Sequence, residues 1–295
     1  MPQWLGKSRG NKLGYQIFVF VVSKLGVRSA YLLLRFVVFY FVLFSRSSTP
    51  HVLDYFRKRH HYRFLKASLH LYRNYYVFGQ TLLDKIVVMA GIKNSFTFHF
   101  DGEENLKEIV RLGNGGILLS GHVGNWEIAG QMLSGLNTRV NVVMFDGEHQ
   151  QIKKYLNKVT DRTFHVIVIR NDLSHVYEIG QALQNNELVC MHADRFVEGA
   201  KTFSKDFLGS PALFPQGPFA IASSFNVPVS FVYAFKETST HYHFFGSTLS
   251  LRKGNISKHD YAEQLANDFV ISLENKMRQY PDQWFNYYNF WETAA

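Results

Sequence analysis

Residues 117–128 read ILLSGHVGNWEI, and this stretch predicts a buried strand, a glycine-bounded turn and a helix in immediate succession. Residues 117–120 have the short apolar pattern of a buried strand, and His122 follows after a single glycine. Gly124 permits backbone conformations that other residues avoid, and Asn125 is a favourable helix N-cap. In open α/β sheets, reactive groups usually lie just past the carboxyl ends of strands, where this segment puts His122.

The alternation of strands and helices continues on both sides of this segment. Apolar runs bounded by turn residues predict strands at 96–100, 140–145, 165–169, 188–192, 229–235 and 243–251. Helical patterns lie between or after them, at 103–112, 125–133, 150–159, 173–183, 218–225 and 258–280. We therefore expect an α/β layered fold with a central, largely parallel sheet flanked by helices.

The N-terminal part of the chain predicts helices that meet a membrane. Two apolar blocks, at 13–22 and 30–44, are separated by basic residues, and the second contains Arg35. That second block is about 15 residues long, which is short of the roughly 20 that a perpendicular span needs. A tilted span, helices in the headgroup region and a buried core helix all remain open. We expect a basic, hydrophobic, membrane-associated segment at residues 1–50 and one catalytic domain at 51–295.

The net charge is concentrated in the same region. The chain carries +9, but twelve basic residues and one acid lie within residues 1–66, so this stretch carries +11 and the remainder −2. Such a segment favours an anionic membrane surface or an acidic protein partner. Nucleic acid is disfavoured, because the charges are interleaved with long apolar runs. Cys190 is the single cysteine, so no intrachain disulfide can form.

His122 and Glu127 are the residues expected to carry the chemistry. On a regular helix, residues five apart point about 140° away from each other. The two can therefore meet only if His122 lies in the turn that precedes the helix. A carboxylate on one imidazole nitrogen fixes the tautomer, and the other nitrogen can then accept a proton from an alcohol. A purely structural His–Glu pair is the alternative.

Four further residues are expected to bind substrate. Gly124 and Asn125 belong to the turn itself, and Asp194 and Arg195 follow the predicted strand at 188–192. A structural ion pair is the alternative role for Asp194 and Arg195. We predict no metal site here, since His192 and Asp194 lack a further cluster of ligands. There is also no G-x-S-x-G elbow and no phosphate-binding loop.

The string GHVGNWE at 121–127 resembles the H-x4-D/E block of the lysophospholipid acyltransferase superfamily. More narrowly, HxGNWE is similar to the bacterial late lipid A acyltransferases, which include lauroyl and myristoyl transferases. Weaker similarities follow in the family's order: LVCMHADR at 188–195, FLG at 207–209, GP at 217–218, VPV at 227–229, and the pairs YP at 280–281 and QW at 283–284.

The resemblance implies an O-acyltransferase of lipid A biosynthesis type. His122 would be the general base and Glu127 its orienting partner. The acyl donor would be acyl carrier protein, or acyl-CoA, and the acceptor a hydroxyl of a membrane glycolipid. The resemblance implies no cofactor and no metal, and a location at the cytoplasmic face of the inner membrane.

Two departures from the family pattern keep other acceptors open. Residues 143–146 read VMFD where a Tyr-Arg pair is common, and the aromatic tail at 285–291 lacks the usual basic residues. An aryl-polyene, an aminolipid or a lysophospholipid is the alternative acceptor. A thioesterase that uses water at His122 and a non-enzymatic peripheral membrane protein are the remaining hypotheses.

Overall fold

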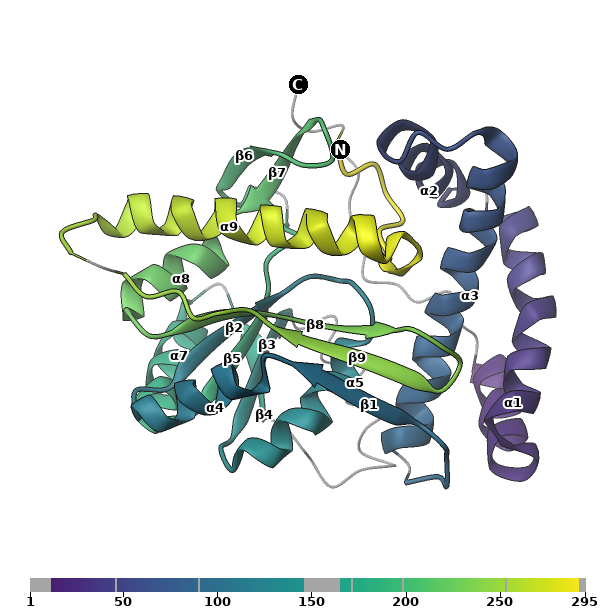
Figure 1. Ribbon diagram of the computed structural model, residues 1–295, viewed down its shortest axis with the longest axis horizontal. Helices are drawn as coiled ribbons and strands as arrows, with labels where there is room; N and C mark the ends of the chain where they lie inside the picture. The colour runs from purple at the N-terminus through teal and green to yellow at the C-terminus, as the bar shows by residue number, and fades with distance from the viewer. Residues whose placement is uncertain are drawn as a thin grey trace.

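The computed structural model describes residues 12–291, except 46, 90, 146–164, 171, 198 and 253. The helix expected at 150–159 lies outside the described residues. Figure 1 shows a central sheet with helices on both faces and a pair of long helices at one end.

The sheet is a mixed sheet of seven strands in the order β1-β9-β8-β2-β5-β3-β4. Five neighbouring strands run parallel, and β9 reverses direction beside β8 and takes β1 with it. The largely parallel sheet predicted from the sequence is therefore confirmed, and the reversal at β8–β9 is its one departure among the described strands. The bounds are β1 Thr97–Asp101, β2 Gly116–Ser120, β3 Val140–Phe145, β4 His165–Ile169, β5 Leu188–His192, β8 Val229–Lys236 and β9 His241–Gly246.

Helices cover both faces because the central strands are apolar on both sides. Ile117 and Leu119 of β2 face a large core that includes side chains from the helices α7, α8 and α9. Leu118, between them, faces the opposite way and packs with Leu106 and Ile109 of α4. The bounds are α4 Glu103–Leu112, α5 Trp126–Met132, a 3-10 turn η2 Leu133–Leu136, α7 Ser174–Gln184, α8 Gly217–Phe225, α9 Lys258–Gln279 and a second 3-10 turn η3 Pro281–Gln283.

A two-stranded hairpin follows the central strand β5. It consists of β6 (Thr202–Asp206) and β7 (Pro211–Pro215), which pair in antiparallel fashion beside α9. The sequence patterns predicted no strand between 192 and 218. The miss has a physical reason: β6 alternates Phe203 with exposed or half-exposed polar residues, and β7 begins and ends in proline, so neither has a strong strand pattern.

The N-terminal part of the described chain is helical. It forms α1 (Lys12–Phe44), α2 (Thr49–Asp54), a π-helical turn η1 (Tyr55–Arg59) and α3 (Phe64–Met89). The two apolar blocks of the sequence belong to α1, which is kinked at Gly26, where φ is +78°. One side of α1 packs on α3 through Ala30, Leu34 and Val38. The two helices lie side by side at the end of the sheet (Figure 1).

The other side of α1 is apolar and exposed. Its large exposed side chains are Ile17, Phe20, Leu25, Leu32, Phe36, Phe39, Tyr40, Leu43 and Phe44. Residues Gln16–Phe44 are long and apolar enough to cross a membrane by length and composition, and only 22% of the most apolar window is buried in the protein. An apolar face this large on a folded chain is typical of a surface that contacts lipid or another protein.

Candidate active site

The strand-turn-helix predicted around His122 is present, and its turn is held from three directions. The N–H of Gly124 donates to the carbonyl of Gln283, and the N–H of Asn125 donates to that of Ala234 in β8. The carbonyl of His122 accepts from the N–H of Phe285. The turn is therefore held between β8 on one side and the end of η3 with the residues after it on the other.

Gly124 is required for this arrangement. Its φ is +58°, and a Cβ built on it would lie 1.9 Å from the carbonyl oxygen of Ala234. Any side chain would push the turn away from β8. Gly124 thus shapes the site through its backbone.

Among the described residues, Asp194 is a carboxylate that bonds the imidazole of His122. Nδ1 of His122 lies 2.7 Å from Oδ1 of Asp194, and the backbone N–H of His122 donates to Oδ2 at 2.9 Å. The two residues follow β2 and β5, neighbouring parallel strands whose carboxyl ends meet at the same edge of the sheet. With an N–H on Nδ1, the ring carries its lone pair on Nε2.

Asp194 is fully buried and remains ionised because of its neighbours. Burial by itself would raise the pKa of Asp194, but the charge and hydrogen bonds of His122, with smaller effects of Arg195 and His192, outweigh it. The pKa of Asp194 consequently lies well below its usual range. A buried, ionised carboxylate on Nδ1 stabilises an imidazolium that forms during proton transfer.

Glu127 lies on the first turn of α5, and its bonded partner is a lysine of α3. Oε1 of Glu127 accepts from Nζ of Lys85 at 2.7 Å, and both side chains are about five-sixths buried, at 16% and 17% exposure. From the sequence, Glu127 is paired with one imidazole nitrogen of His122; in the structure Asp194 makes a carboxylate bond of this kind, to Nδ1. The sequence could not show this, because Asp194 is 72 residues from His122 and reaches it only through the pairing of β2 with β5.

The other expected site residues surround this pair. Asn125 is buried; its Oδ1 accepts from the N–H of Ile128 at 3.4 Å, as an N-cap does, and its Nδ2 donates to the hydroxyl of Tyr242 at 3.2 Å. Arg195 donates to the carbonyl of Phe285 at 2.7 Å. Both side chains thus hold the turn and the C-terminal segment in place.

His192 and Trp126 extend the site as an aromatic stack. The ring of His122 lies 4.3 Å from that of His192, which in turn contacts Trp126 edge-on at 5.1 Å. His122, His192 and Asp194 also have ligand atoms within 4.8 Å of one another. Because both oxygens of Asp194 already accept from His122, this arrangement fits an oriented base better than a metal site.

A buried polar network that the sequence analysis missed connects the turn to α1. Asp84 of α3 accepts from the hydroxyls of Tyr31 and Tyr242 and from Nζ of Lys236, the last at 2.5 Å. Tyr242 also bonds Asn125, so the network reaches the turn that contains His122. Burial raises the pKa of Asp84 and lowers that of Lys236, each opposed by the other's charge. The sequence does contain a sign of this network: residues 82–88 are apolar except for Asp84 and Lys85, and a charged side chain buried in such a run needs a partner.

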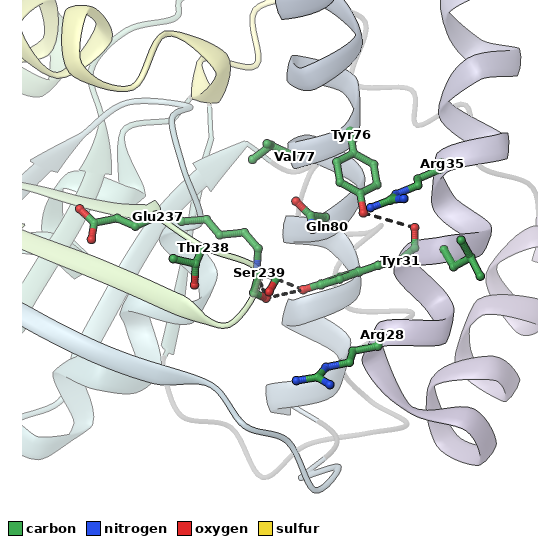
Figure 2. Close-up of a pocket in the computed structure, with 11 residues that line it drawn as sticks. Arg28, Tyr31, Arg35, Tyr76, Val77, Gln80, Glu237, Thr238 and Ser239 are labelled. Carbon is green, nitrogen blue, oxygen red and sulfur yellow. Dashed lines mark hydrogen bonds between the residues drawn. The ribbon is translucent and has the colours of Figure 1, made fainter.

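A cleft of about 640 Å³ opens above this network, between α1, α3 and the β8–β9 turn. Figure 2 shows the guanidinium groups of Arg28 and Arg35 directed from α1 toward it, with Gln80 on α3 and Ser239 on the turn. Its lining combines Arg28, Arg35 and Lys236 with the apolar Leu32 and Val77, and it includes one carboxylate, that of Glu237. The excess of positive charge suits an anionic group, and the two apolar side chains suit an attached apolar chain.

Comparison with known proteins decides the family. The model of the bacterial lipid A biosynthesis acyltransferases matches residues 72–293, which is about three quarters of the chain. The chain belongs to this family. The matched region contains every described strand, His122 and Asp194, as well as Glu127.

The comparisons with curated sequences and with solved structures give no stronger likeness than the family match. No sequence among the curated proteins matches the chain. Among solved structures, the crystal structure of the 1-acyl-sn-glycerophosphate acyltransferase PlsC from Thermotoga maritima is similar, with a TM-score of 0.41 and 15% identity over 84% of this chain and 97% of that one. A shared function does not follow from similarity at this level. The chain is assigned as a lipid acyltransferase on the family match alone.

Proposed function

We propose that this lipid acyltransferase transfers a fatty acyl chain from acyl carrier protein to a hydroxyl of a membrane glycolipid, with His122 as the general base. The observation that carries the proposal is the buried Asp194 on Nδ1 of His122 at the carboxyl ends of β2 and β5. Asp194 orients the ring and stabilises its protonated form. We assign the orienting role to Asp194 and give Glu127 the role of a positioning residue that joins α5 to α3 through Lys85.

The reaction needs no covalent enzyme intermediate. Nε2 of His122 takes the proton of the acceptor hydroxyl as its oxygen attacks the thioester carbonyl carbon. The carbon–sulfur bond then breaks, and the leaving thiolate takes the proton back from the imidazolium. The products are the acyl ester and the free carrier thiol.

The backbone N–H groups of residues 122–125 do not supply the oxyanion donors. They donate to Asp194, Gly121, Gln283 and Ala234, in chain order. The donors for the developing oxyanion must therefore come from the first turn of α5, from side chains or from the carrier complex.

Charge and exposed apolar surface support the proposed location and acyl donor. The exposed face of α1 and the +11 charge of residues 1–66 suit the anionic cytoplasmic face of the inner membrane, and the same charge suits acidic acyl carrier protein. A basic, hydrophobic segment at residues 1–50 and a catalytic domain at 51–295 stay part of the proposal. Gly124, Asn125, Asp194 and Arg195 stay in the proposal as residues that shape the substrate site, through the bonds that hold the turn at His122.

The test compares membrane lipids by mass spectrometry in cells that carry the wild type, His122→Ala or no protein. We expect one lipid to gain the mass of a single acyl chain with the wild type alone, and the same spectrum identifies the acceptor and the chain length. An identical acylated lipid with His122→Ala would contradict the role of His122. Release of free fatty acid without any acylated lipid would instead favour a thioesterase.

A further inference from the structure

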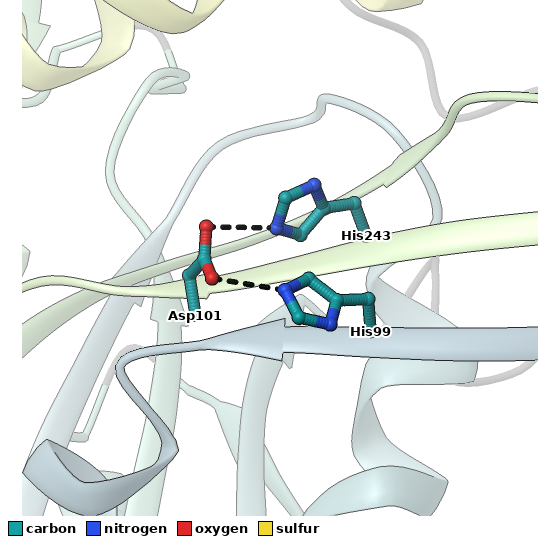
Figure 3. Close-up of side chains that lie close together, drawn as sticks. All are labelled: His99, Asp101 and His243. Atoms are coloured by element: carbon teal, nitrogen blue, oxygen red, sulfur yellow. Dashed lines mark hydrogen bonds and ion pairs between the residues drawn. The ribbon is translucent and has the colours of Figure 1, made fainter.

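A second cluster of histidine and carboxylate side chains lies away from His122, on the strands β1 and β9. It consists of His99, Asp101 and His243, whose ligand atoms lie within 4.8 Å of one another. Nε2 of His99 is 3.1 Å from Oδ1 of Asp101, and Nε2 of His243 is 2.9 Å from Oδ2 (Figure 3). We propose that these three residues form a binding site for a divalent transition-metal ion, Zn²⁺ in the first instance.

Strand register brings the three side chains to one face. His99 and Asp101 are two apart on β1, so they point the same way, and His243 is the register partner of His99 on the parallel strand β9. The site therefore uses rigid elements at fixed spacing. Since β1 is the edge strand of the sheet, a bound ion would tie it to β9.

The donor set selects the metal. Two imidazole nitrogens and one carboxylate oxygen are ligands that zinc and its neighbours in the transition series prefer, whereas Mg²⁺ and Ca²⁺ require oxygen. His99 and Asp101 are more than half exposed, which leaves room for water as a further ligand.

A second carboxylate holds His243 in the orientation that a metal ligand needs. Nδ1 of His243 faces Oε1 of Glu237 at 3.0 Å, and the same oxygen accepts from the hydroxyl of Tyr280 at 2.6 Å. Metal-bound histidines usually donate their second N–H to such a carboxylate. A neutral imidazole has one N–H. If His243 carries it on Nδ1 and donates it to Glu237, Nε2 is left with a lone pair that faces Oδ2 of Asp101, and a cation between these two atoms would bind both.

A positive charge close to the cluster opposes a bound cation. Lys276 of α9 acts electrostatically on Asp101, and its ammonium group lies over the ring of Phe245. With Glu237 and Asp101 both negative, the local charge without metal still favours a cation. The lysine weakens the site without cancelling it.

The test measures Zn²⁺ binding by calorimetry to the tag-free, full-length protein in detergent, with Co²⁺ absorption as a second readout. We expect one ion per chain in the wild type and no measurable binding, at concentrations that saturate the wild type, in His99→Ala and Asp101→Asn. Glu237→Gln should weaken binding by about 10- to 100-fold.

His259→Ala is the control, because it removes an exposed histidine of α9 whose ring contact is with Phe203 and not with the cluster. It should bind Zn²⁺ as the wild type does. Circular dichroism without metal confirms that each variant is folded. Wild-type protein that binds no zinc, or cluster variants that bind it normally, would overturn the proposal, as would a bound ion that is lost in His192→Ala and kept in His99→Ala.

Discussion

At the scale of single residues, the site depends on which carboxylate contacts His122. Asp194 makes that contact and is fully buried, while Glu127 contacts Lys85. The two carboxylates can be separated by changing one at a time to its amide, which keeps the size and removes the charge.

We expect Asp194→Asn to lower kcat by about 10²- to 10⁴-fold, the usual range for an impaired general base, and Glu127→Gln to lower it much less. Both variants are measured with the same donor and acceptor, along with their unfolding temperatures. A larger loss in Glu127→Gln than in Asp194→Asn, without unfolding, would return the orienting role to Glu127.

Gly124→Ala should destabilise the protein by about 1–3 kcal/mol, because alanine must adopt a left-handed backbone conformation and its Cβ would meet the carbonyl of Ala234. Urea unfolding measures the change. Gly135→Ala is the control, since a Cβ there meets nothing within 4 Å and φ is not left-handed. Equal stability of the two variants would show that the turn relaxes freely.

At the scale of elements, α1, α3 and the strands β8 and β9 are joined by the bonds to Asp84. Three of its contacts come from three different elements: Tyr31 in α1, Lys236 in β8 and Tyr242 in β9. Asp84 itself is inaccessible to solvent.

Asp84→Asn leaves the ammonium of Lys236 buried without its counter-charge, so we expect a loss of about 3–5 kcal/mol in the free energy of unfolding. Asp54→Asn is the matched control: it removes a 2.6 Å ion pair with Lys58 in which both side chains are more than half exposed. That variant should change stability by less than about 1 kcal/mol. Similar effects of the two would contradict a structural role for the network.

His60, at the end of η1, should make the protein less stable in acid. Burial, followed by the charge of Arg278, lowers the pKa of His60 to about 4, and Nε2 has no hydrogen-bond partner among the described residues. In the unfolded chain His60 therefore takes up a proton below about pH 6.5, whereas in the folded chain it stays neutral down to about pH 4. Stability falls as the pH drops through that window.

The size of this effect is about 1–2 kcal/mol, since the ring is partly exposed. Thermal unfolding at pH 7.5 and pH 5 measures it. His60→Gln should reduce the difference between the two pH values, whereas His259→Gln, at an exposed position in α9, should leave it unchanged. An unaltered pH dependence in His60→Gln would refute the assignment.

At the scale of the whole molecule, the exposed apolar face of α1 predicts how the protein meets the bilayer. Phe36 and Phe39 are 70% and 60% exposed, so they contribute little to the interior. We expect Phe36→Glu with Phe39→Glu to shift the protein from the membrane to the soluble fraction, because charges at lipid depth are costly.

Ile271→Glu is the control for this shift, since Ile271 is 61% exposed on α9, away from α1. Fractionation of cells and flotation with anionic vesicles provide the measurement. Unchanged flotation of the α1 variant would mean that this face is covered by protein instead of lipid.

Much of the fold follows from the sequence alone because its signals are local. Runs such as residues 117–119 and 142–145 are apolar enough to be buried strands wherever they fall in the sheet, and α4 spans the predicted residues 103–112. The family resemblance of residues 121–127 is also local, and the family match confirms it.

Tertiary structure alone decided which side chains meet. Asp194 reaches His122, His243 reaches Asp101, and Lys236 reaches Asp84 only through pairing or packing of segments that lie far apart in the chain. Helical and strand periodicity reports the direction of a side chain relative to its own backbone, and it contains no information about which strand becomes the neighbour. A reactive role for His122 is therefore a prediction that the sequence alone makes, whereas the carboxylate bonded to it is seen only in the folded sheet.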